Sequence, residues 1–339
     1  MSSTLFAQLR SQLTVDVDSM DPAVAARHTT QDARFCDMTS NQAIVYNEAS
    51  RSERAALLHA ACEQAQASGV DLEQQVIDAL DLLSVLLAKE VFPHLTGRVH
   101  LQTSPSTAYD TEKTIAHAKR LVTLFEAHGI PKSRVCIKIP ITPESIIACQ
   151  YLEKLGIRTL GTCLFSLPQA LAASQAGCLY VAPYFNELRV HFEPALWKEY
   201  SDTIKEHPAI PVIRLVIAAY SQLGSKTLVM PASIVTAEEV VALASLRPHH
   251  LTLSGAVLDK LAATESSGEI PTSSEFESSA CLRGTISADY LADGAEALRS
   301  SLAADEEATR KLVDALKIFD EREQMTKELI RKELTHSIN

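Results

Sequence analysis

A repeated pattern of short apolar runs and helical stretches limits the folds that this chain can adopt. Each apolar run has the length and the β-branched content of a strand, and each is followed by residues with helical spacing. The predicted strands are at 13–20, 35–41, 99–104, 135–140, 158–165, 179–185, 227–233 and 250–254. This alternation predicts an α/β fold. A (β/α)8 TIM barrel is favoured over a doubly wound sheet because no glycine-rich phosphate-binding turn follows the first strand.

Helical segments fill the connections and extend the chain at both ends. Within the barrel, helices are predicted at about 43–92, 111–128, 143–155, 167–176, 194–222, 236–246 and 256–262, with breaks near Gly69, Pro208 and Pro211. A lead-in helix is expected at about 1–12 and additional C-terminal helices at about 287–335. The connector at about 264–280 is rich in Ser, Glu and Thr, which predicts a mobile loop. We expect one domain spanning residues 1–339.

The composition is that of an ordinary globular protein and argues against several classes of function. The chain has 339 residues and a formal net charge of −11 without a basic block, so a nucleic-acid partner is not expected. No apolar run reaches membrane-spanning length and no signal-peptide core is present, which predicts a soluble, cytoplasmic protein. The seven cysteines are scattered without a CxxC pair, a pattern of reduced core thiols rather than of a metal site.

Lys138 lies within the short apolar run at 135–140. Strand alternation turns Lys138 to the face opposite Ile137 and Ile139. An ammonium group buried there loses hydration, so its pKa is expected to fall and leave a nucleophilic amine. The alternative is a strand-end lysine whose stem is buried while its amine reaches water. In a (β/α)8 barrel the functional groups lie inside, toward the carboxyl ends of the strands, and Lys138 has such a position.

Other polar residues are predicted to share the barrel mouth with Lys138. Asp18 ends the first strand and Asn41 ends the second, although each could instead cap the helix that follows. Alternation also points four further polar side chains inward, those of Gln102, Thr162, Tyr184 and Ser233. A buried amine that attacks a carbonyl needs a proton shuttle, and a nearby carboxylate does that work. The convergence of these groups on one lysine favours a Schiff-base site over unrelated polar core residues.

The segment from 109 to 185 resembles transaldolase. The matching motifs are Tyr109-Asp-Thr-Glu112, Ile137-Lys-Ile139, Leu152-Glu-Lys-Leu-Gly-Ile157, Leu164-Phe-Ser-Leu-Pro-Gln-Ala170, Ala176-Gly177 and Ala182-Pro-Tyr184. Weaker matches at 15–21, 37–41, 229–233 and 251–253 extend the resemblance over nearly the whole chain. The resemblance implies a (β/α)8 barrel enzyme of carbohydrate metabolism that acts on a small carbonyl or sugar substrate and needs neither a metal nor an organic cofactor.

The resemblance also implies a role for each matching residue. Lys138 matches the Schiff-base lysine, which captures a ketose and holds a dihydroxyacetone unit after the C–C bond breaks. Asp18 matches the carboxylate that moves protons on the scissile hydroxyl, and Asn41 matches the amide that holds the donor's hydroxyl groups. Thr162 matches a hydroxyl that orders the catalytic water, and Ser233 matches a serine at the substrate end.

Several positions depart from the family pattern. The glutamate that partners the catalytic water falls at Gln102, and a phenylalanine of the sixth strand falls at Tyr184. Together these two residues look like the related fructose-6-phosphate aldolase branch, in which a tyrosine hydroxyl takes over part of the acid and base work. An asparagine and a serine of the family's substrate site fall at Leu160 and Ala182.

The two basic positions that bind the sugar phosphate in the family fall at Glu187 and Val235. A phosphate dianion would be repelled by Glu187, and the bidentate guanidinium that grips phosphate is missing. Arg189 or Lys226 could replace these positions only if a loop is reshaped. The sequence therefore favours a Schiff-base aldolase or transaldolase-type enzyme whose carbonyl substrate lacks the usual phosphate.

Two alternatives stay open at this point. One is ordinary transaldolase activity of the pentose phosphate pathway, with sedoheptulose 7-phosphate and glyceraldehyde 3-phosphate as substrates. The other is a catalytically idle barrel kept as a binding protein, against which stands the cost of burying a lysine without a role. The resemblance also implies a homodimer, which we expect to form through the C-terminal helices.

Overall fold

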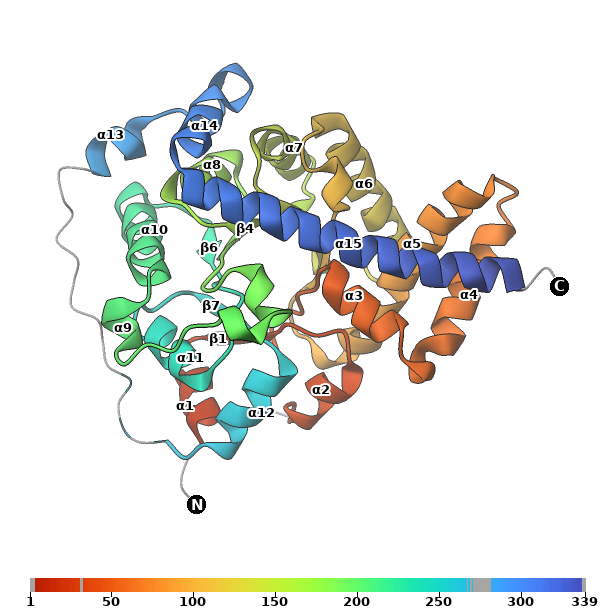
Figure 1. Ribbon diagram of the computed structural model, residues 1–339, viewed down its shortest axis with the longest axis horizontal. Coiled ribbons are helices and arrows are strands. Elements are labelled where there is room, and N and C mark those ends of the chain that lie inside the picture. Colours follow the sequence, from red (N-terminus) through yellow and green to blue (C-terminus); the bar gives the residue numbers. More distant parts are fainter. Residues whose placement is uncertain (1–3, 31–32, 267, 269, 271–281, 337–339) are drawn as a thin grey trace.

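The computed structural model describes residues 4–30, 33–266, 268, 270 and 282–336. In these residues, seven parallel strands surround one core and helices lie outside them (Figure 1). The strands are β1 (Thr14–Val17), β2 (Val99–Gln102), β3 (Val135–Pro140), β4 (Arg158–Leu164), β5 (Tyr180–Pro183), β6 (Leu228–Val229) and β7 (His250–Leu253). Their valine, isoleucine and leucine side chains are mostly buried, so the strands form the centre of the hydrophobic core.

Pairing between strand edges closes the barrel. β2 to β6 form one ladder in chain order, and β1 pairs with β7. Met38 bridges Val17 of β1 to Val99 of β2, so the segment around it takes the place of a second strand. Between β6 and β7, the Thr252 N–H donates to the Pro231 carbonyl (3.4 Å). The chain is therefore a (β/α)8 barrel, and the predicted fold class is confirmed.

Two predicted strands are shorter than the sequence indicated. The second one is reduced to isolated bridges at Phe35 and Met38, because Asn41 already begins the next helix. The predicted strand at 227–233, which the structure has as β6, ends at Val229, since Pro231 has no N–H with which to continue the ladder.

Helices occupy the connections between the strands. They are α2 (Pro22–Arg27), α3 (Gln42–Ala49), α4 (Ala55–Gln66), α5 (Leu72–Val91), α6 (Thr111–Ala127), α7 (Pro143–Lys154), α8 (Leu167–Ala176), α9 (Thr203–Glu206), α10 (Ala209–Leu223), α11 (Ala237–Ala244) and α12 (Gly255–Ala263), with the 3-10 turns η3 (Pro105–Thr107), η5 (Leu188–His191) and η6 (Pro194–Leu196) on the loops. The break predicted at Pro211 is wrong. This proline lies in the first turn of α10, where its missing N–H removes no helical hydrogen bond.

Further helices lie at both ends of the chain. α1 (Leu5–Gln12) precedes the barrel and is capped by Thr4, while α13 (Leu282–Ser287), α14 (Ala292–Ala304) and α15 (Glu306–His336) follow it. The long α15 crosses the molecule and packs on α3, α4, α5 and η5 (Figure 1). Most of the predicted loop at 264–280 falls outside the described residues. Among the helices that the structure describes, none has the length and apolar character needed to cross a membrane.

A hydrogen-bonded polar cluster fills the barrel one layer below Lys138, two residues nearer the amino ends of the strands. The Asp37 N–H donates to Asp16 Oδ1 (2.8 Å), and His250 Nδ1 shares a 2.7 Å hydrogen bond with Asp16 Oδ2. Asp37 Oδ2 binds His100 Nε2 at 2.8 Å. The cluster ties β1, β2 and β7 to the segment between β1 and β2, so it braces the base of the barrel.

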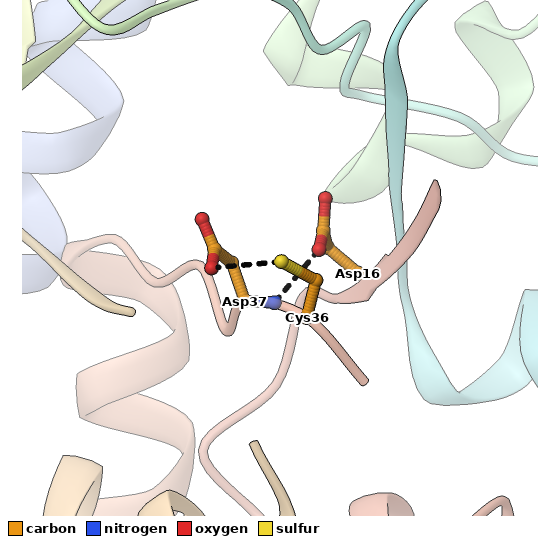
Figure 2. Close-up of side chains that lie close together, drawn as sticks. All are labelled: Asp16, Cys36 and Asp37. Carbon is orange, nitrogen blue, oxygen red and sulfur yellow. Dashed lines mark hydrogen bonds between the residues drawn. The ribbon is translucent and has the colours of Figure 1, made fainter. Parts of the chain in front are cut away.

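Cys36 lies beside both carboxylates of this cluster, as Figure 2 shows. One oxygen or sulfur atom from each of Asp16, Cys36 and Asp37 lies within 4.8 Å of the others, a spacing that a metal ion could fill. However, burial raises the pKa of Cys36 to about 12, so the thiol keeps its proton, and it donates to Asp37 Oδ1 (3.4 Å). The carboxylate oxygens already accept hydrogen bonds from the chain. We interpret the group as a structural hydrogen-bonded cluster.

Candidate active site

Lys138 lies inside the barrel, on a strand whose six residues are all buried. The residue is 3% exposed, and its amine donates to the Ser40 carbonyl (3.1 Å). Burial lowers the pKa of Lys138, and the negative charge of Asp18 opposes this shift. The alternative of an amine that reaches bulk water does not hold. A larger share of this amine is uncharged than in a solvated lysine, which makes it a better nucleophile.

The Lys138 amine opens into a pocket with a volume of about 230 Å³ at the carboxyl ends of the strands. Four other predicted site residues line the same pocket: Asp18, Asn41, Tyr184 and Ser233. Asp18 follows β1, and its Oδ1 accepts a hydrogen bond from Thr39 Oγ1 (2.6 Å). Asp21 rather than Asp18 caps α2, so the Asp18 carboxylate is left to face the pocket.

Asn41 serves the fold and the pocket at once. Its Oδ1 accepts hydrogen bonds from the Ala43 N–H (2.9 Å) and the Ile44 N–H (3.1 Å), which caps the N-terminus of α3. The prediction that Asn41 could cap the following helix is therefore confirmed. The capping hydrogen bonds hold the Asn41 amide at the pocket wall. The side-chain nitrogen carries the donors with which Asn41 can meet a substrate oxygen.

Tyr184 and Thr162 lie side by side. Thr162 Oγ1 donates to Tyr184 Oη (3.3 Å), and burial raises the pKa of Tyr184 well above its usual value. The pairing of β4 with β5 shifts register between Gly161 and Leu164, which is typical of a bulge that re-aims side chains. The phenol thus keeps its proton and can exchange it through Thr162.

Gln102 is turned away from this pair. Its Nε2 donates to Gln42 Oε1 (2.7 Å), and together with Asn41 it lines a separate cavity of about 20 Å³. Its buried Oε1 accepts no hydrogen bond among the described residues. The part of the chain that the structure describes has no hydrogen bond from Gln102 to Thr162 or to Tyr184. The structure therefore does not join the three residues that the sequence grouped around one water.

Four residues at the predicted substrate end differ from the family pattern, and all four lie outside the lining of the Lys138 pocket: Leu160, Ala182, Glu187 and Val235. Leu160 and Ala182 are fully packed in the core. Glu187 forms a bidentate ion pair with Arg310 (2.9 and 3.0 Å). The Val235 N–H donates to Glu239 Oε2 (2.7 Å).

The two basic residues that could have replaced the phosphate-binding positions are placed elsewhere. Arg189 donates from Nε to Asp314 (3.1 Å) and from Nη1 to Glu193 (2.9 Å), so its guanidinium is already paired. Lys226 precedes β6, at the amino end of the barrel and away from the mouth that holds Lys138. Neither residue lines the pocket.

Sequence reasoning missed several residues of the pocket wall. His191 at the end of η5 and Ser254 at the N-terminus of α12 both line it, as does Asn47 on α3. Ser254 is the last residue of the predicted strand at 250–254, so strand alternation was an available signal for it. His191 and Asn47 lie on a 3-10 turn and a helix, where strand alternation gives no direction for a side chain.

A buried amine and a carboxylate at the mouth of a (β/α)8 barrel are the groups that a Schiff-base aldolase uses. A sequence model described as "Transaldolase/Fructose-6-phosphate aldolase" matches residues 14–330 of this chain. The chain therefore belongs to the transaldolase/fructose-6-phosphate aldolase family, and it is an enzyme of the Schiff-base aldolase and transaldolase type.

Individual relatives agree with the family match. A protein named "Transaldolase" from Aliivibrio salmonicida is 32% identical over 286 residues, which cover 81% of this chain and 88% of the relative. A "Transaldolase" from Alteromonas mediterranea is 34% identical over 288 residues, with 81% and 88% covered. One from Fusarium oxysporum is 33% identical over 262 residues, covering 77% of this chain and 78% of its own length.

Proposed function

We propose that this enzyme makes or breaks a C–C bond through a Schiff base on Lys138, with a dihydroxyacetone-like donor and a substrate that lacks the usual sugar phosphate. The observation that carries the proposal is the buried Lys138 amine, which shares a pocket with Asp18. A desolvated amine and a carboxylate are the two groups that carbonyl capture and proton transfer require.

In the proposed cleavage, the Lys138 amine adds to the ketose carbonyl and water leaves to give the Schiff base. Asp18 takes the proton of the scissile hydroxyl as the C–C bond breaks, and an aldehyde departs. The electron pair stays on the bound three-carbon unit as an enamine. In a transfer reaction, the enamine carbon attacks a second aldehyde, whose oxygen takes the proton back from Asp18. Water then releases the product from the lysine.

Tyr184, Thr162 and Asn41 are proposed to assist this sequence. The Tyr184 hydroxyl and Thr162 hold the water that forms and later hydrolyses the Schiff base, supported by their hydrogen bond of 3.3 Å. Asn41 holds a donor hydroxyl with its side-chain nitrogen. Gln102 is proposed to act one step away, by orienting Gln42 next to Asn41, because its hydrogen bond goes to Gln42.

The residues around the pocket support a substrate without a phosphate group. Among the described residues that line it, none is an arginine, and the only lysine is Lys138. At the two family phosphate positions, Glu187 is ion-paired with Arg310 and the Val235 N–H is bonded to Glu239, so neither position offers an unpaired donor to a dianion. Leu160 and Ala182 are packed in the core, at positions where the family has hydrogen-bonding groups, so neither offers a hydrogen bond to a substrate.

The direct test is reduction with sodium borohydride in the presence of dihydroxyacetone, followed by mass spectrometry of the peptides. A mass increase on the peptide that contains Lys138 is expected. If no carbonyl donor gives an adduct there, the Schiff-base proposal fails and the idle-barrel alternative gains support.

Ordinary transaldolase activity is the second candidate. It is favoured by relatives named "Transaldolase" and by Ser254, which stands at the N-terminus of α12 in the pocket without capping that helix through its side chain. Free N–H groups at a helix N-terminus attract anions. A coupled assay with fructose 6-phosphate and erythrose 4-phosphate separates the candidates, because normal turnover would contradict the phosphate argument.

The predicted homodimer and cytoplasmic location stay predictions. Val313 on the outer face of α15 is 51% exposed, which gives the C-terminal helices one apolar group for a subunit contact. Light scattering of the purified protein would measure a mass of either 36.9 kDa or twice that value.

A further inference from the structure

A histidine and a serine lie together at the mouth of the Lys138 pocket. His191 ends η5, which follows β5, and Ser233 lies on the loop after β6. His191 Nε2 and Ser233 Oγ share a hydrogen bond of 2.9 Å, and both residues line the pocket with Asp18. In the barrel order, β5 and β6 are two and three strands away from the strand of Lys138. The pair and the lysine therefore line one pocket from different strands of the barrel.

Ser233 is held in place by the surrounding loops. Its backbone is left-handed, with φ at 60°, a conformation that costs a serine free energy and that clusters at functional sites. Its carbonyl accepts hydrogen bonds from the Asn186 N–H (3.1 Å) and from Asn186 Nδ2 (3.0 Å). Asn186 Nδ2 also donates to the buried carboxylate of Glu239 (2.9 Å). These bonds fix the position of the Ser233 hydroxyl before a substrate arrives.

Glu239 connects the loop of Ser233 to the loop of His191. It accepts hydrogen bonds from the Val235 N–H (2.7 Å), on the first loop, and from Trp197 Nε1 (2.8 Å), on the second. The carboxylate is almost fully buried. A buried acceptor with three donors makes the relative position of the two loops rigid, so the His191–Ser233 pair is preorganised.

The chemistry of the pair suits a hydroxyl group better than a phosphate. His191 is solvent-exposed at the pocket mouth, and the surrounding loops partly desolvate its ring, which lowers its pKa against the charge of Asp18. The neutral ring offers one donor and one acceptor. Among the described residues, His191 Nδ1 has no hydrogen-bond partner. A substrate hydroxyl both donates and accepts, whereas a phosphate dianion only accepts and needs cations or several donors.

We propose that His191 and Ser233 form the subsite that binds a hydroxyl group at the far end of an uncharged hydroxyaldehyde acceptor. This inference rests on the proposed function and deepens it, because it names the class of acceptor and the residues that select it. The aldehyde carbon of the acceptor meets the enamine next to Asp18, and its hydroxyl end reaches the pair.

The test compares two acceptors of equal chain length, glyceraldehyde and propionaldehyde, with dihydroxyacetone as the donor. H191F and S233A are expected to lose about tenfold in kcat/KM with glyceraldehyde, mainly through KM, and less than about twofold with propionaldehyde. H191N keeps one donor and one acceptor and is expected to recover most of the loss. H59F replaces a histidine whose side chain is 51% exposed on α4, and it serves as the matched control.

Three results would overturn the inference. Equal losses with both acceptors would mean that the pair only supports the loop structure. If the wild type prefers glyceraldehyde 3-phosphate to glyceraldehyde and H191F abolishes this preference, the pair is a phosphate-binding site. Unchanged kinetics in H191F and S233A would remove the pair from recognition. Borohydride trapping on Lys138 in every variant separates these outcomes from a failure of the proposed function, which would show no adduct even in the wild type.

Discussion

Replacing Lys138 with methionine should abolish the Schiff base and stabilise the fold at the same time. Methionine has a similar length and no charge, so it fits the space without leaving a cavity. In the described residues, the Lys138 amine makes one hydrogen bond, to Ser40, and no carboxylate lies within the 4.0 Å of an ion pair. A buried polar group with too few partners costs about 1–3 kcal/mol in the free energy of unfolding.

The gain in K138M is expected to depend on pH in one direction. The usual pKa of lysine is 10.5, and that of folded Lys138 lies below it, so between these two values the unfolded chain binds more protons than the folded one. Wild-type stability therefore rises with pH through that window. Below the folded pKa the penalty for the buried charge is fully present, and there the advantage of K138M is greatest. It shrinks as the pH approaches 10.5.

Thermal unfolding measured by calorimetry at several pH values checks this prediction. A stabilisation of about 1–3 kcal/mol corresponds to a rise of roughly 1–4 °C in Tm for a chain of this size. K113M is the control, because the Lys113 side chain is 72% exposed and its removal should change stability by less than about 0.5 kcal/mol. A lower Tm in K138M, or a gain that grows with pH, would refute the reasoning that the buried amine is destabilising.

Three other variants test the site and its support. D18N is expected to lower kcat by about 10²–10⁴-fold while borohydride still traps a donor on the lysine, because proton transfer is lost but amine attack is not; loss of the adduct as well would contradict this division of roles. Y184F should slow Schiff-base formation and hydrolysis by at least about tenfold in stopped-flow assays, and an unchanged rate would exclude the phenol. Burial raises the pKa of Asp37, but the hydrogen bonds from His100, Arg98 and Tyr180 and the charge of His100 together lower it, so D37N breaks a buried pair and should reduce the unfolding free energy by about 3–5 kcal/mol. EDTA should leave the wild-type Tm unchanged if the Cys36 cluster holds no metal.

The sequence predicted the parts of the fold that depend on local pattern. β3 (Val135–Pro140) and α8 (Leu167–Ala176) lie at their predicted bounds, because strand alternation and helix spacing are properties of adjacent residues. The same alternation turned Lys138 and Tyr184 into the barrel. It failed where proline or a helix cap cut a strand short, as at Pro231, because hydrogen bonding there overrides the apolar pattern.

The resemblance in the sequence identified the lysine, but it could not tell which polar side chains share its pocket. Gln102 was expected with Thr162 and Tyr184, yet the structure pairs it with Gln42, which precedes it by 60 residues. Such a choice depends on how strand ends and loops pack once the barrel is closed. No spacing in the chain encodes it.

The alternating pattern alone thus determined that this chain builds a barrel and that Lys138 points into it. Tertiary structure decided what surrounds the far end of the pocket. Glu187 is neutralised by Arg310 from 123 residues away, and His191 meets Ser233 across 42 residues. The physical reason is that periodicity fixes the direction of a side chain along one strand, whereas its partners come from other strands and loops, which only closure of the barrel brings within hydrogen-bonding distance.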